Sequence, residues 1–341
     1  MPNENPIEVL CTIYFSDELV QKWRDLSPRL HINVISTRRV EDISDEIWAR
    51  TEVLYTDRVL PPREFTPNLR WLQFHFAGID FASANPLLKD PGLVMTTLSG
   101  AAAPQVAEYA LGAMLAAGHK FPAIQKNQLK TEWPSDRWLR FVPRELRGST
   151  VGIIGYGSIG REIARLLQPF NCTILAAKRD VFHPQDSGYQ HEGFGDPEGN
   201  LFKRLYPIQA LKSMLKLCDF AVVCLPLTQE TRGLIGEEEL KAMKKGSFLI
   251  DVGRGGVVDG KAVEEAVKSE WLGGAVLDVF AEEPLPGNNP LWQIPNSIIS
   301  PHVAGISAAY LERAAELFAV NLQRYLDEEP LLNRFDPERG Y

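Results

Sequence analysis

The sequence predicts an α/β protein with two doubly wound parallel-sheet domains. Short apolar runs of strand length alternate with stretches of helix length over most of the 341 residues, which is typical of parallel strands joined by helical crossovers. A chain of this length has room for two domains of ordinary size. A glycine-rich turn at residues 155–160, between a strand and a helix, marks the start of the second sheet.

The composition is that of a globular protein, with 45% hydrophobic and 23% charged residues. The net charge of −8 argues against partners such as nucleic acid or an anionic membrane. We find no secretory signal and no apolar run of the roughly 18 residues that span a bilayer. The four cysteines have neither disulfide nor metal-ligand spacing, so we expect free thiols, a cytoplasmic protein and no metal site.

The first domain is expected to comprise residues 1–103 together with 307–341. Its strands are expected at 7–14, 30–35, 53–56, 69–74 and 94–97, its helices at 17–26, 46–50 and 307–326. The last of these helices would cross back to the first domain, which the tail 333–341 would then complete.

The second domain is expected to cover residues 104–306. It begins with a helix at 104–120 that is small and apolar on most faces, so we expect it to be buried, between the domains. The later helices are expected at 161–168, 208–216, 237–243 and 260–269, and six or seven strands are expected, namely 151–154, 172–177, 220–225, 247–252, 274–279 and 297–300. Residues 133–138 form a polar-aromatic loop. Residues 183–207 lack apolar periodicity and are interpreted as a surface loop, with a flap over the cofactor as the alternative.

Each glycine of the turn has its own physical reason. Gly155 permits the tight bend, Gly157 lets backbone approach a pyrophosphate, and Gly160 lets the helix pack close to the strand. The helix N-terminus then offers unpaired N–H groups and the positive end of its dipole to phosphates. Because a strand precedes the motif and a helix and second strand follow it, we interpret it as a dinucleotide-binding turn.

Three charged residues follow three successive strands of the second domain, namely Arg254, Glu283 and His302. Ligands of doubly wound sheets bind beyond the carboxyl ends of the strands, so these side chains would share one edge. Arg254 can bind a carboxylate with two hydrogen bonds, and His302 can exchange a proton with a hydroxyl or carbonyl oxygen. Glu283, if bonded to His302, favours the imidazolium. A hydride would then pass between substrate carbon and nicotinamide.

Nearly the whole chain resembles the D-isomer-specific 2-hydroxyacid dehydrogenase family, which includes glyoxylate/hydroxypyruvate reductases and phosphoglycerate dehydrogenases. The motifs that carry the resemblance are the runs 152–160, 224–228, 251–255, 277–284 and 300–302. The resemblance implies a flavodoxin-like catalytic domain, a Rossmann dinucleotide-binding domain, a cleft between them, and a homodimer. It makes Arg254 the substrate-binding arginine, Glu283 the acid beside the histidine, and His302 the general acid/base.

The resemblance also assigns residues to the two ligands. It places the backbone of the first domain against the substrate carboxylate at Ala77, Gly78, Ser99 and Gly100. It assigns to the cofactor Gly155, Tyr156, Gly157, Ser158, Ile159, Gly160, Leu225, Pro226, Thr231, Val252, Gly253, Asp278 and His302, with Asp278 at the nicotinamide carboxamide.

The end of the second strand departs from the family pattern. Lys178 and Arg179 stand where an acid selecting NAD is expected, and two cations there would attract a 2′-phosphate. The sequence therefore predicts a preference for NADP(H), with NAD(H) still possible because Asp180 follows.

The function predicted is hydride transfer between NAD(P)H and a 2-oxo acid, giving a D-2-hydroxy acid. Glyoxylate- or hydroxypyruvate-type substrates are favoured. The alternative is a nicotinamide-sensing corepressor on the same fold, although the chain lacks the disordered extensions that such a binding protein would carry. A formate dehydrogenase is disfavoured because Glu283 stands where that enzyme has a glutamine.

Overall fold

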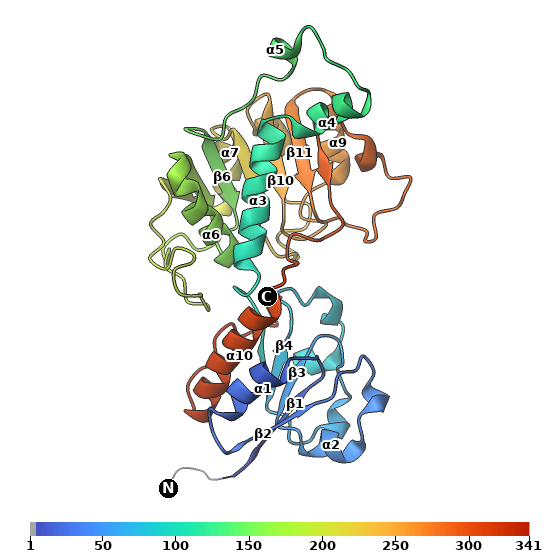
Figure 1. The fold of residues 1–341 in the computed structure, drawn as a ribbon. Helices are drawn as coiled ribbons and strands as arrows, with labels where there is room; N and C mark the ends of the chain where they lie inside the picture. The colour runs from blue at the N-terminus through green and yellow to red at the C-terminus, as the bar shows by residue number, and fades with distance from the viewer. Residues whose placement is uncertain (1–4, 341) are drawn as a thin grey trace. The chain divides into compact units, whose positions relative to one another are not determined.

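The structure is a computed structural model that describes residues 5–340, and these form two compact units (Figure 1). The first unit runs to Ala102 and resumes at Ser307, and the second covers Ala103–Ile306. The change of unit at Ala103 lies one residue before the expected position. Each unit is an α/β layer structure built on its own parallel sheet.

The first unit contains a five-stranded sheet in the order β2-β1-β3-β4-β5, which is the flavodoxin-like order. Its strands are β1 (Ile7–Cys11), β2 (Leu30–Val34), β3 (Val53–Thr56), β4 (Trp71–Phe74) and β5 (Val94–Thr96), and its helices are α1 (Asp17–Arg24), α2 (Asp45–Arg50) and α10 (Tyr310–Leu326). All neighbouring strands are parallel. The central strands β3 and β4 are buried along their whole length, as strands covered on both faces must be.

Helix α10 completes the core of the first unit from the far end of the chain. It packs against α1, where the indole of Trp23 donates a hydrogen bond to the carbonyl of Ala315 (2.9 Å). The ring of Phe318 on the same helix packs edge-on to Trp23 and Tyr55, with centroids 5.0 and 4.8 Å apart. The predicted return of the chain to its first domain is therefore correct.

The second unit contains a seven-stranded parallel sheet in the order β12-β11-β10-β9-β6-β7-β8. Its strands are β6 (Thr150–Ile154), β7 (Thr173–Ala177), β8 (Arg204–Tyr206), β9 (Phe220–Val223), β10 (Ser247–Asp251), β11 (Leu272–Leu277) and β12 (Ile298–Ile299). Its helices are α3 (Ala103–Gly118), α4 (Phe121–Leu129), α5 (Arg137–Arg140), α6 (Ser158–Leu167), α7 (Leu211–Leu215), α8 (Glu237–Ala242) and α9 (Gly260–Lys268). This is the Rossmann order. Successive strands are added on one side of β6 as far as β8, and from β9 onwards they are added on its other side.

Helix α3 lies along this sheet beside α6 (Figure 1). Its alanines Ala107, Ala110 and Ala117 are buried, as predicted for a helix that is apolar on most faces. Gly118 at its end permits a close crossing, because an added Cβ would lie 2.5 Å from the carbonyl oxygen of Arg144.

Three parts of the sequence interpretation are wrong. The segment 183–207 is not only a surface loop, since it ends in the edge strand β8 and buries Asp196 and Tyr206. A three-residue strand is too short to leave a periodic signal. Helices α4 and α5 were missed because the described residues of both elements are only partly buried or exposed, without an apolar stripe. Helix α6 begins at Ser158, three residues before the predicted start, because Gly157 is its N-cap.

None of the described helices is long and apolar enough to cross a membrane. Over residues 5–340, no group of three or more His, Cys, Asp or Glu side chains is arranged to hold a metal ion. The four cysteines are free thiols. Burial raises the pKa of both Cys11 and Cys218 to about 12, so these two are unreactive core residues.

Candidate active site

The structure brings His302 and Glu283 into direct contact. The strands β10, β11 and β12 are parallel neighbours, so the loops after them leave the same edge of the second sheet. His302 Nδ1 lies 2.8 Å from Glu283 Oε2, and the other carboxylate oxygen accepts a hydrogen bond from the backbone N–H of Phe280 (2.9 Å). Because the carboxylate holds Nδ1, Nε2 is the nitrogen left to exchange a proton with a substrate.

The backbone of His302 adopts a left-handed conformation, with φ of 53°. Such a conformation is uncommon for residues other than glycine and requires support from the surroundings. The support comes from the backbone N–H of His302, which donates to the carbonyls of Asp278 (2.9 Å) and Ser300 (3.0 Å). The imidazole is half-exposed, so the strained loop presents it to solvent.

Asp278 holds the loop that carries His302. Its carboxylate accepts hydrogen bonds from the hydroxyl of Ser300 (2.6 Å) and from the backbone N–H groups of Val303 (2.9 Å) and Ala304 (2.9 Å). The hydroxyl of Tyr109 on α3 in turn bonds to that of Ser300 (2.5 Å). A carboxylate has about four acceptor positions, so roughly one remains for a ligand. The sequence interpretation missed Tyr109 and the loop-holding function of Asp278.

Arg254 follows β10, where its Nη1 donates to the carbonyl of Gly253 (2.9 Å). The glycines on either side of it permit close packing of this loop. A Cβ on Gly253 would lie 2.8 Å from the carbonyl oxygen of Leu225, and one on Gly255 would lie 1.8 Å from that of Phe280. The Arg254 loop is thus pressed against the loops that follow β9 and β11, on the edge where His302 and Glu283 meet.

Asp251, the last residue of β10, was not singled out by the sequence analysis. It is buried, and its burial, together with the charge of Asp278, raises its pKa to about 8 against the opposing hydrogen bond from the Gly253 N–H (3.1 Å). Asp251 is therefore a neutral acid at neutral pH, next to the edge that carries Arg254.

The glycine-rich turn has the geometry that a pyrophosphate requires. A Cβ on Gly155 (φ 101°) would lie 2.9 Å from the carbonyl oxygen of Cys224, and one on Gly160 would lie 2.2 Å from that of Gly155. Gly157 differs, because nothing lies within 4 Å of its Cβ position. The space in front of the α6 N-terminus, where Ser158 and Ile159 form the first turn, is thus open to an anion.

The loop after β9 borders this turn. A Cβ on Gly155 would lie 3.1 Å from the side chain of Leu225. The hydroxyl of Thr231 donates to the carbonyl of Pro226 (2.6 Å) and closes the loop, and the N–H of Val252 continues the sheet by donating to Val223 (3.1 Å). Leu225, Pro226 and Thr231 are therefore on the loop that adjoins the glycine-rich turn, and Val252 begins the loop next to it on the far side of β9.

Two cations follow β7, as predicted, and both have partners. Lys178 Nζ donates to the carbonyl of His183 (2.7 Å), and Arg179 forms an ion pair with Glu230 (3.6 Å) on the loop after β9. Burial and the nearby charge of Arg161 lower the pKa of Lys178. Asp180 accepts hydrogen bonds from the His183 ring (2.7 Å) and the Phe182 N–H (3.0 Å). Tyr156 is also buried, so only its backbone is available to a cofactor.

The first unit places its candidate substrate residues at the carboxyl edge of its sheet. Ala77 and Gly78 follow β4, and Ser99 and Gly100 follow β5. Gly100 has a φ of 98°, a conformation that glycine adopts without strain. The side-chain amide of Asn333 donates to the carbonyl of Ser99 (2.7 Å), so the returning tail fixes this loop.

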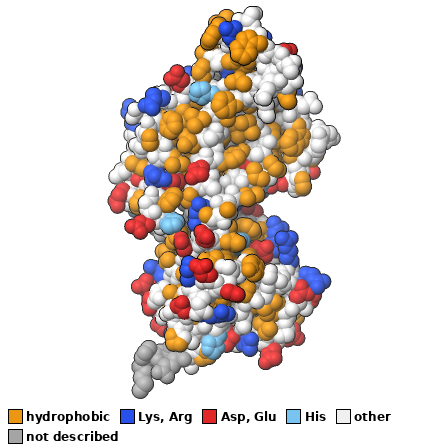
Figure 2. Space-filling model, in the orientation of Figure 1, with side chains coloured by type: hydrophobic (Ala, Val, Ile, Leu, Met, Phe, Trp, Pro, Cys, Tyr) orange, Lys and Arg blue, Asp and Glu red, His pale blue; other side chains and the backbone are white. Residues whose placement is uncertain are grey.

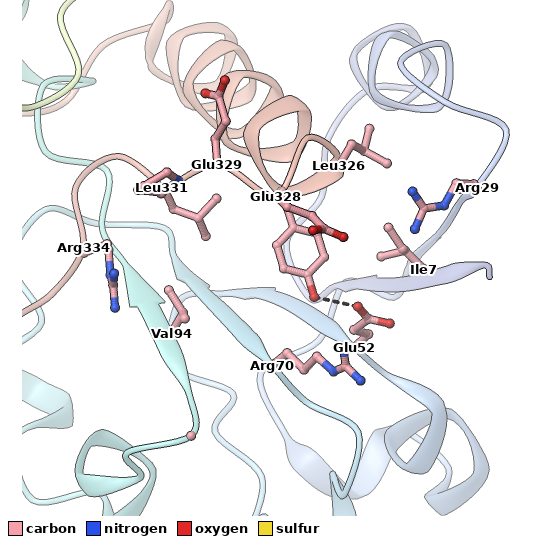
Figure 3. Close-up of a pocket in the computed structure, with 13 residues that line it drawn as sticks. Ile7, Arg29, Glu52, Arg70, Val94, Leu326, Glu328, Glu329, Leu331 and Arg334 are labelled. Atoms are coloured by element: carbon pink, nitrogen blue, oxygen red, sulfur yellow. Dashed lines mark hydrogen bonds between the residues drawn. The ribbon is translucent and has the colours of Figure 1, made fainter. Parts of the chain in front are cut away.

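The opposite edge of the first sheet contains a cavity of about 660 Å³ (Figure 3). It is lined by Ile7, Arg29, Glu52, Arg70, Val94, Tyr325 and neighbouring residues, and the Tyr325 hydroxyl donates to Glu52 (2.6 Å). Several of these residues lie at the amino ends of their strands, whereas doubly wound sheets bind ligands at the carboxyl ends. We therefore do not assign the chemistry to this cavity.

A Rossmann sheet with a phosphate-binding turn, and with an arginine and a histidine–glutamate pair on the same edge, defines a nicotinamide-dependent oxidoreductase. Residues 111–304 match the family described as D-isomer specific 2-hydroxyacid dehydrogenase, NAD binding domain. The chain belongs to the D-isomer specific 2-hydroxyacid dehydrogenase family.

Relatives and solved structures agree with this assignment. The chain is 33% identical to the glyoxylate reductase of Thermofilum pendens over 81% of its own length and 78% of the relative's. It is 30% identical to the glyoxylate reductase of Korarchaeum cryptofilum over 88% of its own length and 84% of the relative's. The D-isomer specific 2-hydroxyacid dehydrogenase of Xanthobacter autotrophicus, solved with NADPH and MES, superposes with a TM-score of 0.77 at 26% identity over 99% and 100% of the two chains.

The chain is therefore an NAD(P)-dependent oxidoreductase that reduces a 2-oxo acid to a 2-hydroxy acid, or catalyses the reverse reaction. The predicted fold class, family and enzyme activity are confirmed, and the comparisons do not favour the corepressor alternative.

Proposed function

We propose that this enzyme reduces glyoxylate and similar small 2-oxo acids, such as hydroxypyruvate, with NADPH. The contact of 2.8 Å between His302 Nδ1 and Glu283 carries the proposal, because it forms an acid/base pair on the edge that also carries Arg254. The names of the relatives supply the substrate, since several are glyoxylate reductases. The cations Lys178 and Arg179 supply the cofactor preference.

Each site residue has one task in the proposed reaction. Arg254 binds the substrate carboxylate with two hydrogen bonds. A bound nicotinamide cofactor would supply the hydride for the carbonyl carbon. His302 Nε2 gives its proton to the carbonyl oxygen as the C=O π bond breaks, so that a hydroxyl forms. Glu283 stabilises the imidazolium before transfer, and Asp278 keeps the loop of His302 in place.

The residues around the glycine-rich turn would hold the cofactor. The N-terminus of α6 and the open space at Gly157 suit the pyrophosphate. The loops of Leu225, Pro226, Thr231, Val252 and Gly253 would line the rest of the dinucleotide, as the family resemblance implies. Lys178 and Arg179 would bind the 2′-phosphate of NADP(H). NAD(H) is the alternative cofactor, with Asp180 as the carboxylate that would bind a ribose hydroxyl.

We further propose that the enzyme is a cytoplasmic homodimer. Free cysteines suit a reducing compartment. The exposed segment 121–142 supports a second copy as the partner, because it leaves large apolar side chains in solvent. These are Phe121, Ile124, Leu129, Trp133, Trp138, Leu139 and Val142. Figure 2 shows hydrophobic side chains exposed around α5.

The test is oxidation of NADPH and of NADH, measured side by side with glyoxylate, hydroxypyruvate, pyruvate and phenylpyruvate. We expect turnover of glyoxylate or hydroxypyruvate, with the higher kcat/KM for NADPH. The His302→Ala variant should lose about 10²–10⁴-fold in kcat while its affinity for NADPH is unchanged. Turnover like that of the wild type in this variant, or a preference for NADH, would contradict the corresponding part of the proposal.

A further inference from the structure

Residues 183–207 are attached to the glycine-rich turn by a buried polar network. The hydroxyl of Tyr156, inside the turn, donates to Asp196 Oδ2 (2.6 Å). The guanidinium of Arg161, directly after Gly160, donates from Nη1 to the carbonyl of Asp196 (2.6 Å) and from Nη2 to that of Pro184 (2.5 Å). Tyr156, Arg161 and Asp196 are at most 2% exposed, so these bonds form in the interior.

The charges in this network make the attachment specific. Arg161 Nε lies 3.3 Å from the carboxylate of Asp186, and the guanidinium stacks 5.0 Å from the centre of the Tyr156 ring. A buried charge is costly unless it is paired and hydrogen-bonded, and removing one partner leaves the other uncompensated. The segment therefore has one favoured position, which is set by side chains of the turn and of α6.

This position determines the partners of the residues that follow β7. Pro184, whose carbonyl is fixed by Arg161, directly follows His183. The carbonyl of His183 accepts a hydrogen bond from Lys178 Nζ (2.7 Å). The imidazole ring of His183 binds the carboxylate of Asp180 (2.7 Å). His183 thus binds both Lys178, the cation that would attract a 2′-phosphate, and Asp180, the carboxylate that would bind a ribose hydroxyl.

We propose that residues 183–207 are a positioning element of the cofactor site, and that Arg161 acts through His183 on Lys178 and Asp180. Arg161 is buried and bound to the segment, so it is a positioning residue for the 2′-phosphate and does not bind it. The proposal rests on the NADP(H) preference proposed above. It predicts that discrimination between a ribose 2′-phosphate and a 2′-hydroxyl depends on residues that contact neither group.

The test compares dissociation constants for NADPH and NADH, measured by fluorescence titration without substrate. Lys178→Met should weaken NADPH binding about tenfold and NADH binding much less, since only the phosphate loses a charged partner. Arg161→Lys keeps the charge but cannot bond both carbonyls, and should lower the preference for NADPH by about threefold or more. Loss of folded protein reduces the number of sites and leaves the ratio of the two constants unchanged.

A second variant avoids the buried position. His183→Ala is exposed and removes the ring that binds Asp180, so it should also lower the preference for NADPH. Glu198→Gln is the matched control, because it removes one charge from an exposed site on the same segment and should leave the ratio unchanged. Because Arg161 acts in part through Lys178, the double variant Arg161→Lys/Lys178→Met should lower the ratio by less than the two single effects combined.

The outcomes separate the two proposals. A changed ratio in Lys178→Met with unchanged ratios in Arg161→Lys and His183→Ala would overturn this inference and leave the NADPH preference standing. An unchanged ratio in Lys178→Met would overturn the proposed preference and, with it, this inference. A fully additive double variant would show that Arg161 acts by another route and would also overturn the inference.

Discussion

At the residue scale, the buried acid Asp251 makes stability depend on pH. The folded chain holds its proton up to about pH 8, whereas the unfolded chain releases it near pH 4. Between these values the folded state binds more protons, so the free energy of unfolding falls as the pH rises, and levels off above about pH 8. Asp251→Asn cannot ionise. The melting temperature of the variant minus that of the wild type should therefore increase as the pH increases from about 4 to 8.

Thermal melts of both proteins at about pH 5 and pH 8 would check this expectation. A constant difference between the two melting temperatures at the two pH values would contradict the assignment of Asp251 as a neutral acid.

A second prediction at this scale concerns the pair of His302 and Glu283. Glu283→Gln replaces the carboxylate that accepts from His302 Nδ1 with a neutral amide, which holds the ring in its orientation less firmly. Reductive turnover should then fall about tenfold or more in kcat, while NADPH affinity stays that of the wild type. Glu282→Gln is the control, since it changes the adjacent exposed acid. Equal kcat in all three proteins would refute the role of Glu283.

At the scale of the element, the turn before α6 contains one glycine that the fold requires and another that we expect only cofactor binding to require. Gly160 is required by the fold, because a Cβ there would strike the Gly155 carbonyl, whereas Gly157 has open space and a φ of −91°. Gly157→Ala should therefore keep the melting temperature of the wild type. It should weaken NADPH binding about tenfold or more, because the methyl group occupies the space that a pyrophosphate would enter.

Gly160→Ala gives the contrast, and we expect it to destabilise the second unit. Melting curves and cofactor titrations of the two variants check both statements. Equal NADPH affinity in Gly157→Ala and the wild type would contradict the proposed binding of the pyrophosphate at this position.

The elements also explain what the sequence could predict. The strands are apolar runs bounded by turns, and the glycine motif, Arg254, Glu283 and His302 follow strands, so their common edge could be inferred. Strand β8 could not, because it has three residues and forms only as an edge beside β7. The network of Tyr156, Arg161 and Asp196 was equally hidden, since Asp196 lies 40 positions from Tyr156 and 35 from Arg161 and meets them only after folding.

At the scale of the whole molecule, the exposed apolar residues of 121–142 predict self-association. Trp138 and Leu139 are 75% and 80% exposed, more than is usual for such side chains outside an interface. The double variant Trp138→Glu/Leu139→Glu should convert the proposed dimer to a monomer, because two charges would have to be buried at the contact. Light scattering after size exclusion measures the mass directly. Phe182→Glu is the control, at an equally exposed aromatic outside this segment. A monomeric wild type would contradict the proposed homodimer.

The return of the chain to its first unit sets an order for synthesis on the ribosome. The second unit is continuous from Ala103 to Ile306, whereas the first lacks α10 until Tyr310–Leu326 have been made. Until then the indole of Trp23 lacks its acceptor, the carbonyl of Ala315, and the carbonyl of Ser99 lacks its donor, the side-chain amide of Asn333. Domains usually fold as units while the chain is made, N-terminal first. Here the unit that begins first waits for a segment that is made after the whole second unit, so the surface that α10 will cover stays exposed on the nascent N-terminal sheet in the meantime.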